Sequence, residues 1–150
     1  MVEKNTENPL VSVIIPVYNR EDMIDDAVKS VLASTYEDIE VIVVDDGSAD
    51  GSVDVVRRIN DERVLLLEYG ENKGQSFAKN YGVSHSKGQY IAFCDSDDEW
   101  DPEKLSKQME RLISEGGRVV YCPFTKQYED GKRTILRPGG GLKAEGDLFQ

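Results

Sequence analysis

The sequence is short of basic residues and contains no long apolar run. Lys and Arg number 18 against 29 Asp and Glu, which gives a formal net charge of -11 over 150 residues. A nucleic-acid-binding protein needs a basic face to neutralise phosphates, and anionic membrane surfaces attract basic segments, so this balance argues against both partners. No run approaches the roughly 20 apolar residues of a membrane span. We therefore expect no transmembrane segment and no nucleic-acid partner.

Cysteine is also scarce, with only Cys94 and Cys122 in the whole chain. Their separation gives no CxxC pair and no metal-ligand spacing. Each lies in an apolar run, which predicts buried, reduced thiols. Residues 1–8 are polar and lack the apolar centre of a signal peptide. The sequence therefore predicts a cytoplasmic protein.

Strand-like and helix-like segments alternate along most of the chain. Short, β-branched apolar runs are typical of strands that are buried on both faces of a parallel sheet. Helix-like segments with an apolar stripe lie between these runs. The order predicts an α/β fold of three layers, α/β/α, with a mostly parallel, Rossmann-like sheet. The predicted strands are 10–17, 39–44, 64–67 and 89–94, and the predicted helices are 21–34, 51–59, 75–86 and one that begins at Asp101-Pro102.

Local signals refine several of these elements. Asn19 is a candidate N-cap for the first helix, and Asp101 followed by Pro102 is a strong helix start. In the helix 75–86, Ala78, Tyr81 and Gly82 form the predicted close-packing side. Leu105, Met109, Leu112 and Ile113 form the predicted apolar stripe of the last helix.

The last part of the chain has a different pattern. Residues 118–121 are strand-like, and residues 124–128 and 134–136 predict a β-hairpin around Asp130-Gly131. Residues 144–150 resemble the start of a helix. We expect a flexible segment at 1–9, a core domain at 10–117, and the start of a further, truncated region at 118–150.

Three polar clusters follow predicted strands: Tyr18-Asn19, Asp45-Asp46-Gly47-Ser48 and Asp95-Ser96-Asp97-Asp98. Ligands of open parallel sheets bind beyond the carboxyl ends of the strands, so these clusters predict a binding site there. The loop Asn72-Lys73-Gly74 and Lys79 fall near the same edge. Lys73 or Lys79 could contact a diphosphate, although each is also an ordinary solvated lysine.

The acidic cluster 95–98 carries three carboxylates that repel one another when ionised. A divalent cation removes that repulsion, and hard oxygen ligands suit Mg²⁺ or Mn²⁺. The alternative is a solvated acidic turn that caps the next helix. An EF-hand loop is excluded, because Trp100 stands where glycine is required.

The cluster 45–48 has two interpretations of equal weight. A carboxylate here could accept hydrogen bonds from a ligand. Alternatively, Gly47 supplies a tight turn with positive φ and Ser48 caps the following helix. The sole histidine, His85, lies at a predicted helix end, where it interacts with the helix dipole.

Several nucleotide and hydrolase motifs are missing. The sequence contains no GxxxxGK[ST], no GxGxxG and no GxSxG. These absences exclude P-loop kinases, ordinary dinucleotide dehydrogenases and nucleophile-elbow hydrolases.

Four segments together resemble the successive motifs of family 2 glycosyltransferases of the GT-A fold. They are VSVIIPVYNR at 11–20, VVDDGSADGS at 43–52, ENKGQSFAKNYG at 71–82 and GQYIAFCDSDDEWDPEKL at 88–105. The resemblance spans about residues 10 to 115, in the family's order and spacing. It implies metal-dependent, usually inverting transfer of a sugar from a nucleotide-diphosphate sugar, with Mn²⁺ or Mg²⁺ as cofactor.

The resemblance also implies roles for individual residues. Asp46, with Asp45 beside it, matches the acid that holds uracil, which points to a UDP-sugar. Asp97 would lie against the ribose, while Asp98 or Asp95 would bind the metal of a DxD-type site. Lys79 stands where the family often has arginine, as a phosphate contact. Residues that match the walls of the nucleotide pocket are Pro16, Val17, Tyr18 and Asn19.

Inverting transfer needs a base to deprotonate the acceptor hydroxyl. In the family this acid lies downstream, often in a Glu-Asp pair, and family domains are longer than this chain. Glu129-Asp130 is such a pair, but it comes too early. We therefore expect the donor-binding part of a larger enzyme of polysaccharide or glycolipid synthesis, with a saccharide or lipid-linked acceptor. Such an enzyme could lie at the inner face of the membrane. Leu142, Leu148 and Phe149 are candidate contacts of a homodimer.

Other functions stay open at this point. A catalytically silent domain could keep the nucleotide-sugar pocket. A sugar-1-phosphate nucleotidyltransferase usually has a glycine-rich, basic loop after its first strand, where this chain has Pro16–Arg20. Phosphatases of the haloacid dehalogenase type place DxD on the first strand, whereas here it follows the fourth.

Overall fold

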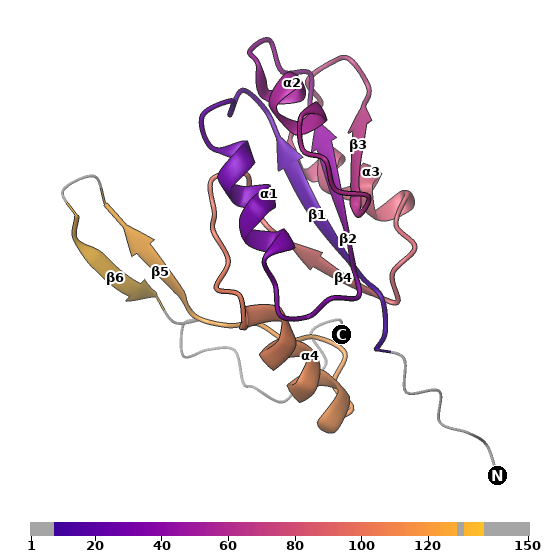
Figure 1. Cartoon of the computed structure of the whole chain (residues 1–150), viewed down its shortest axis with the longest axis vertical. Helices are drawn as coiled ribbons and strands as arrows, with labels where there is room; N and C mark the ends of the chain where they lie inside the picture. The colour runs from indigo at the N-terminus through magenta and orange to yellow at the C-terminus, as the bar shows by residue number, and fades with distance from the viewer. Residues whose placement is uncertain (1–7, 129–130, 137–150) are drawn as a thin grey trace. The chain divides into compact units, whose positions relative to one another are not determined.

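A four-stranded parallel sheet forms the centre of the first part of the chain (Figure 1). The computed structural model describes residues 8–128 and 131–136. The chain divides into two compact units, Met1–Ser106 and Lys107–Gln150, and the sheet belongs to the first. The strand order is β3-β2-β1-β4. The strands are β1 (Val11–Val17), β2 (Ile39–Asp45), β3 (Val64–Glu68) and β4 (Tyr90–Phe93).

The two central strands carry the most buried part of the sheet. Val11 pairs with Ile39 and Val17 pairs with Asp45, so β1 and β2 end at the same level. All seven residues of β1 are buried. Continuous β-branched runs suit this position because helices cover both faces of the sheet.

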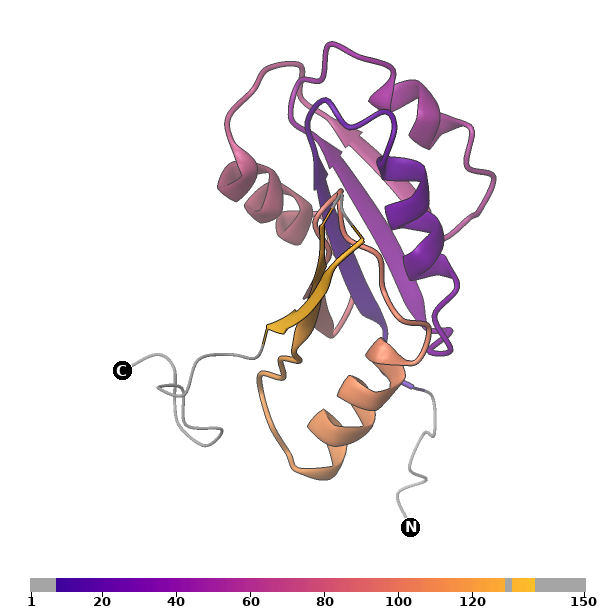
Figure 2. The ribbon, with the colours of Figure 1, turned by 90° about the vertical axis from the view of Figure 1, so that its left-hand side faces the viewer.

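Helices lie on both faces of this sheet. Figure 2 shows α1 (Ile24–Leu32) and α2 (Ser52–Arg57) on one face and α3 (Gln75–Ser84) on the other. The three-layer α/β/α prediction is therefore confirmed. These helices are shorter than the sequence predicts: α1 begins only after a turn at 21–23, α2 begins one residue later than predicted, and α1, α2 and α3 each end two residues earlier.

A glycine allows α3 to approach the sheet closely. A Cβ atom on Gly82 would lie 2.6 Å from Cγ2 of Ile14 and 3.1 Å from Cγ2 of Val44. Ala78, one turn earlier, is fully buried against the same two side chains and Ile42. The predicted close-packing side of this helix is confirmed.

The segment after β4 returns alongside α1. The amide of Trp100 donates a hydrogen bond to Oγ of Ser30 at 3.0 Å. The amide of Thr35 donates to the Pro102 carbonyl at 2.8 Å. Oδ1 of Asp101 accepts the Glu103 amide at 2.9 Å, as predicted for a helix cap, and α4 (Lys104–Ser114) follows.

Most of the predicted apolar stripe of α4 is confirmed. Leu105, Met109 and Leu112 are buried, whereas Ile113 is 53% exposed and lies off the stripe. The helical repeat of 3.6 residues explains the difference, because adjacent positions point about 100° apart.

The second unit contains a β-hairpin of β5 (Phe124–Gln127) and β6 (Arg133–Leu136), which confirms that prediction. Gly131 has a φ of 80°, as its turn requires. The predicted strand at 118–121 is wrong, because these residues pair with no strand in the described part of the chain. An apolar run becomes a strand only when a partner edge is within hydrogen-bonding reach.

Some predictions fall outside the described residues. They concern the flexible N-terminus, Glu129-Asp130, the helix start at 144–150 and the dimer contacts Leu142, Leu148 and Phe149. Among described residues, no helix is both long and apolar enough to cross a membrane. Both cysteines are free thiols. Cys94 is buried as predicted, whereas Cys122 is partly exposed, which corrects that prediction.

Candidate functional site

A cleft of about 390 Å³ lies at the carboxyl edge of the sheet. Four segments line it: the end of β1 with the loop after it, the residue after β2, the loop that enters α3 with the first residue of that helix, and the turn after β4. Residues after β1, β2 and β4 therefore meet, as expected for parallel strands. The lining residues are Pro16, Val17, Tyr18, Arg20, Asp46, Asn72, Gly74, Gln75, Asp95, Ser96 and Asp97.

The loop after β1 is tied to the loop after β2 through Asn19. Its amide donates to Oγ of Ser48 at 3.0 Å, and its Oδ1 accepts the Ala49 amide at 2.8 Å. Asn19 has a φ of 50°, in the left-handed region that asparagine tolerates. The predicted helix cap at Asn19 is wrong, because Met23 precedes α1 and the Asn19 side chain bonds the other loop. Asn19 is not among the residues that line the cleft.

Further bonds continue this connection. The Arg20 amide donates to Oγ of Ser52 at 2.8 Å, and the Glu21 amide donates to Oδ2 of Asp50 at 3.1 Å. Oε2 of Glu21 accepts the Gly51 amide at 2.7 Å. Burial alone would raise the pKa of Asp50, but hydrogen bonds from Ser52 and from the Glu21 amide lower it overall. Arg20 therefore lies at the cleft in a segment whose backbone is fixed by hydrogen bonds at Arg20 itself and at its two neighbours, Asn19 and Glu21.

Asp45 closes the turn that follows β2. Its carboxylate accepts the amides of Gly47 and Ser48, each at 3.1 Å. It is buried and does not line the cleft. The predicted helix cap at Ser48 is wrong, because its hydroxyl accepts Asn19 and the Ser52 amide instead bonds Asp50.

Asp46 lines the cleft and also holds the loop that leads into α3. Oδ1 accepts the Tyr69 hydroxyl at 2.5 Å and the Lys73 amide at 2.7 Å. Oδ2 accepts the Gly74 amide at 2.9 Å. A carboxylate has about four acceptor positions. Three are used within the protein, so one is left for a ligand.

Gly47 makes this arrangement possible. Its φ is 77°, as the sequence predicts, and a Cβ atom there would lie 2.8 Å from the Asn72 nitrogen. Any side chain would therefore push away the loop that Asp46 holds. Burial raises the pKa of the Tyr69 hydroxyl, and the bond to Asp46 raises it further, so this donor stays protonated.

Both lysines considered as candidate phosphate contacts are engaged in ion pairs. Nζ of Lys79 lies 2.8 Å from Oδ1 of Asp95, which also accepts the Gln75 amide nitrogen at 2.9 Å. Nζ of Lys73 lies 2.7 Å from Oε1 of Glu71. Neither lysine is among the residues that line the cleft.

The acidic cluster after β4 forms a turn, in which the Asp98 amide donates to the Asp95 carbonyl at 3.0 Å. Asp97 lines the cleft, and Asp97 and Asp98 are exposed. Although the Asp98 side chain is exposed, partial desolvation raises its pKa, and the nearby charges of Asp95 and Asp97 raise it further. A cation would relieve this repulsion, so the donor set fits a hard metal ion.

No group of three acidic, histidine or cysteine side chains converges on a metal position in the described part of the chain. The cluster therefore suits a cation that takes most of its ligands from water and substrate phosphates, as Mg²⁺ commonly does. His85 ends α3 as predicted, with Nδ1 2.8 Å from the Tyr81 carbonyl oxygen, and it does not line the cleft.

The family is decided by a sequence model named "Glycosyl transferase family 2", which matches residues 12–145. The chain belongs to glycosyltransferase family 2. It is 42% identical over 119 residues to the Escherichia coli UDP-Glc:alpha-D-GlcNAc-diphosphoundecaprenol beta-1,3-glucosyltransferase WfaP, covering 79% of this chain and 46% of that protein. The chain spans half or less of the length of the curated relatives it matches.

Solved structures of glycosyltransferases share the fold. A Pyrobaculum calidifontis mannosyltransferase in complex with GDP-Man and Mn²⁺ has a TM-score of 0.67 and 31% identity, over 71% of this chain and 33% of that one. Staphylococcus aureus TarS in complex with UDP-GlcNAc has a TM-score of 0.66 and 28% identity, over 70% of this chain and 31% of that one. The predicted GT-A fold is therefore confirmed.

The cleft of this family 2 member combines predicted and unpredicted residues. Predicted residues that line it are Pro16, Val17, Tyr18, Asp46, Asp95 and Asp97, whereas Asn19, Asp45, Lys79 and Asp98 do not. Asn72 and Gly74 belong to a loop that the sequence places near this edge. Ser96 also lines the cleft and belongs to the predicted cluster 95–98. Arg20 and Gln75 line it as well, and both lie inside segments that carry the family resemblance, although the sequence predicts no role for either.

Proposed function

We propose that this glycosyltransferase domain binds a UDP-sugar in the cleft, and that the enzyme transfers its sugar to an acceptor hydroxyl with inversion. The observation that carries the proposal is the meeting of Tyr18, Asp46 and Asp97 in one cleft of about 390 Å³. The family resemblance assigns these positions to the nucleoside. Similar glycosyltransferases have been solved in complex with GDP-Man and with UDP-GlcNAc, which supports a nucleotide-sugar donor.

The hydrogen bonds of Asp46 favour uracil over guanine. Tyr69, Lys73 and Gly74 already occupy three acceptor positions of the carboxylate. Uracil presents one ring N–H between two carbonyl groups, whereas guanine presents a ring N–H beside an amino group. A carboxylate with one remaining acceptor position satisfies the first pattern and leaves a donor of the second unpaired.

The carboxylates after β4 have separate proposed tasks. Asp97 faces the ribose, and Asp98 holds Mn²⁺ or Mg²⁺, with Asp95 as the second candidate ligand. Lys79 and Gln75 bond Asp95 and thereby fix its position beside the cleft. When bound, the metal neutralises the charge that develops on the diphosphate leaving group.

The acceptor side belongs to the rest of the enzyme in this proposal. Residues 10–117 form the donor-binding core, and residues 118–150 begin the acceptor-side region. We expect the catalytic base, which takes the proton of the acceptor hydroxyl, to be an Asp or Glu downstream of the DxD-type site. We propose a saccharide or lipid-linked acceptor, in line with the E. coli relative that is named for a diphosphoundecaprenol substrate.

Calorimetric titration of the chain with UDP, GDP and dTDP, each with Mn²⁺ and with EDTA, tests the proposal. We expect UDP to bind, GDP to bind at least about tenfold more weakly, and EDTA to weaken UDP binding. If no diphosphate binds, the donor site is wrong. If UDP does bind, a UDP-sugar hydrolysis assay separates an enzyme from a silent domain, because a silent domain binds the donor without turning it over.

A further inference from the structure

The charge balance of the cleft calls for a positive group. Asp46, Asp95 and Asp97 all line it, and Arg20 is the one cationic side chain among the lining residues that the structure describes. A nucleoside diphosphate would add further negative charge. Close charges of one sign repel strongly where water is partly excluded, so the diphosphate needs a cation of the protein or a bound metal.

The two lysines near the cleft already form ion pairs with carboxylates of the protein. Lys79 pairs with Asp95 at 2.8 Å and also lies over the Phe93 ring. Lys73 pairs with Glu71 at 2.7 Å, and its Nζ lies 4.9 Å from the centre of the Phe77 ring. Moving either lysine onto a phosphate would break an existing ion pair.

Arg20 is held in place by its backbone while its guanidinium remains available. Its amide is fixed to Ser52, and the neighbouring residues Asn19 and Glu21 bond the loop at 48–51. The side chain makes one local bond, from Nη1 to the Asn19 carbonyl at 3.2 Å. Within the described ranges no carboxylate pairs with it.

We propose that Arg20 is the protein's ligand for the diphosphate of the sugar donor. The planar guanidinium carries five N–H donors in a fixed fork that matches two phosphate oxygens, whereas a lysine ammonium is a compact point charge without that geometry. Hydrogen bonds between the loops at 18–21 and 48–52 hold the backbone of Arg20 so that its side chain lies at the cleft. This inference rests on the proposed function, because it names the contact of one part of the donor.

The test compares Arg20→Gln with wild type, using UDP by calorimetry and uridine by NMR titration. We expect UDP to bind about tenfold more weakly or worse, both with Mn²⁺ and in EDTA, and uridine binding to be unchanged. Arg20→Lys should recover part of the affinity as a point charge.

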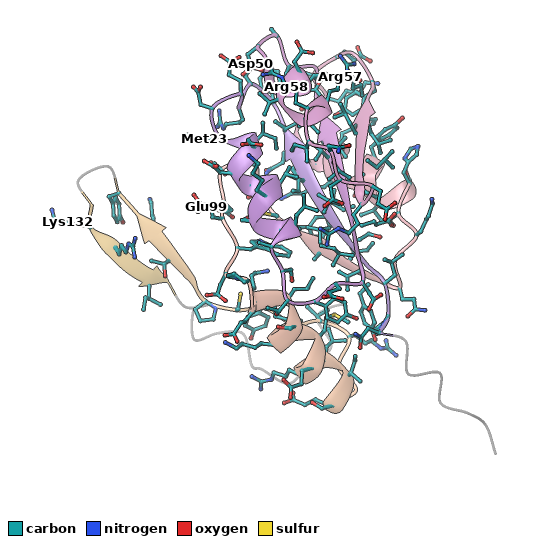
Figure 3. The ribbon with its side chains drawn as sticks, viewed as in Figure 1. Met23, Asp50, Arg57, Arg58, Glu99 and Lys132 are labelled. Atoms are coloured by element: carbon teal, nitrogen blue, oxygen red, sulfur yellow. The ribbon has the colours of Figure 1, made fainter. Side chains whose placement is uncertain are left out.

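Arg58→Gln is the matched control. Arg58 follows α2 and is labelled in Figure 3, does not line the cleft, and bonds the Asp54 carbonyl. The Arg58→Gln substitution removes the same charge from the same unit as Arg20→Gln does, so UDP binding should stay within twofold of wild type. Thermal unfolding of both variants checks that each is folded.

Three outcomes would overturn this inference. Unchanged UDP affinity in Arg20→Gln would show that the guanidinium makes no contact with the diphosphate. Equal losses for uridine and UDP would assign Arg20 to the nucleoside instead. If wild type binds no UDP, the proposed function itself fails, whereas the first two outcomes leave it standing.

Discussion

The Tyr69 hydroxyl donates a hydrogen bond to Oδ1 of Asp46, and so joins the end of β3 to the end of β2. The same carboxylate accepts the amides of Lys73 and Gly74, which lead into α3. One buried acid therefore organises a loop that contributes three residues to the cleft: Asn72, Gly74 and Gln75.

Tyr69→Phe should loosen this loop. Removing a hydrogen bond to a charged group lowers the free energy of unfolding by roughly 1–3 kcal/mol, measured by urea unfolding. UDP affinity should fall several-fold in calorimetry, because the loop loses one of its anchors. Tyr81→Phe is the control, since the Tyr81 ring contacts Tyr69 while its hydroxyl makes no hydrogen bond within residues 8–128 and 131–136. Equal effects of the two substitutions would contradict the role of the Tyr69 hydroxyl.

Asp98→Asn should remove the metal dependence of UDP binding. If Asp98 holds the cation, Mn²⁺ will no longer strengthen UDP binding in this variant, while binding in EDTA will match wild type. Glu99→Gln, at the labelled neighbour in Figure 3, is the control with the same charge change in the same loop. Calorimetry of both variants with Mn²⁺ and EDTA decides the point. Unchanged manganese dependence in Asp98→Asn would remove Asp98 from the metal site.

The pair between Asp61 and Arg63 should make stability depend on acid pH. Hydrogen bonds from the Arg63 side chain lower the pKa of Asp61 from 3.8 to about 2. Since the unfolded chain then binds more protons, the stabilisation is complete above about pH 5 and is lost as pH falls toward 2. Because the pair is partly exposed, we expect about 1 kcal/mol.

Urea unfolding of wild type and Asp61→Asn between pH 7 and pH 2.5 measures this contribution. The difference in the free energy of unfolding should be largest at neutral pH and shrink below about pH 5. Asp22→Asn, at an exposed carboxylate of the same unit, should differ from wild type by less than about 0.5 kcal/mol throughout. A difference for Asp61→Asn that stays constant with pH would refute the linkage.

Gly82→Ala should destabilise the packing of α3 on the sheet. The new methyl group would lie 2.6 Å from Cγ2 of Ile14, inside the fully buried core. Overpacking costs roughly 1–3 kcal/mol, and the better helix propensity of alanine offsets at most about 1 kcal/mol. We expect a net loss of about 1–2 kcal/mol in urea unfolding. Asn80→Ala, at an exposed position of the same helix, should change stability little, and a Gly82→Ala protein as stable as wild type would contradict this packing.

The architecture was largely predictable because it rests on short-range patterns. Apolar runs such as 11–17 and 39–45 become central strands, and the alternation with amphipathic segments gives the parallel order. The strand predicted at 118–121 does not form, because strand pairing does not follow from a short-range pattern. Its residues have strand propensity, but pairing needs a partner edge, which no local pattern specifies.

The position of the site was predictable from the same logic, whereas its internal contacts were not. Parallel strands bring their carboxyl ends to one edge, so Tyr18, Asp46 and Asp97 meet in the cleft. The sequence predicts Asn19 to be a helix cap and a pocket residue, yet its side-chain oxygen accepts a hydrogen bond from the Ala49 amide. Lys79 resembles a phosphate ligand, yet it pairs with Asp95.

The sequence by itself determined the order of elements, the sheet edge that carries the cleft, and the membership of family 2, because these follow from periodicity and ordered motifs. Only the tertiary structure decided which polar groups remain available there. Asp46 is largely occupied by Tyr69 and the loop before α3, while Arg20 is presented without a carboxylate partner in the described part of the chain. Those outcomes depend on hydrogen bonds between loops far apart in sequence, and such bonds have no periodic signature.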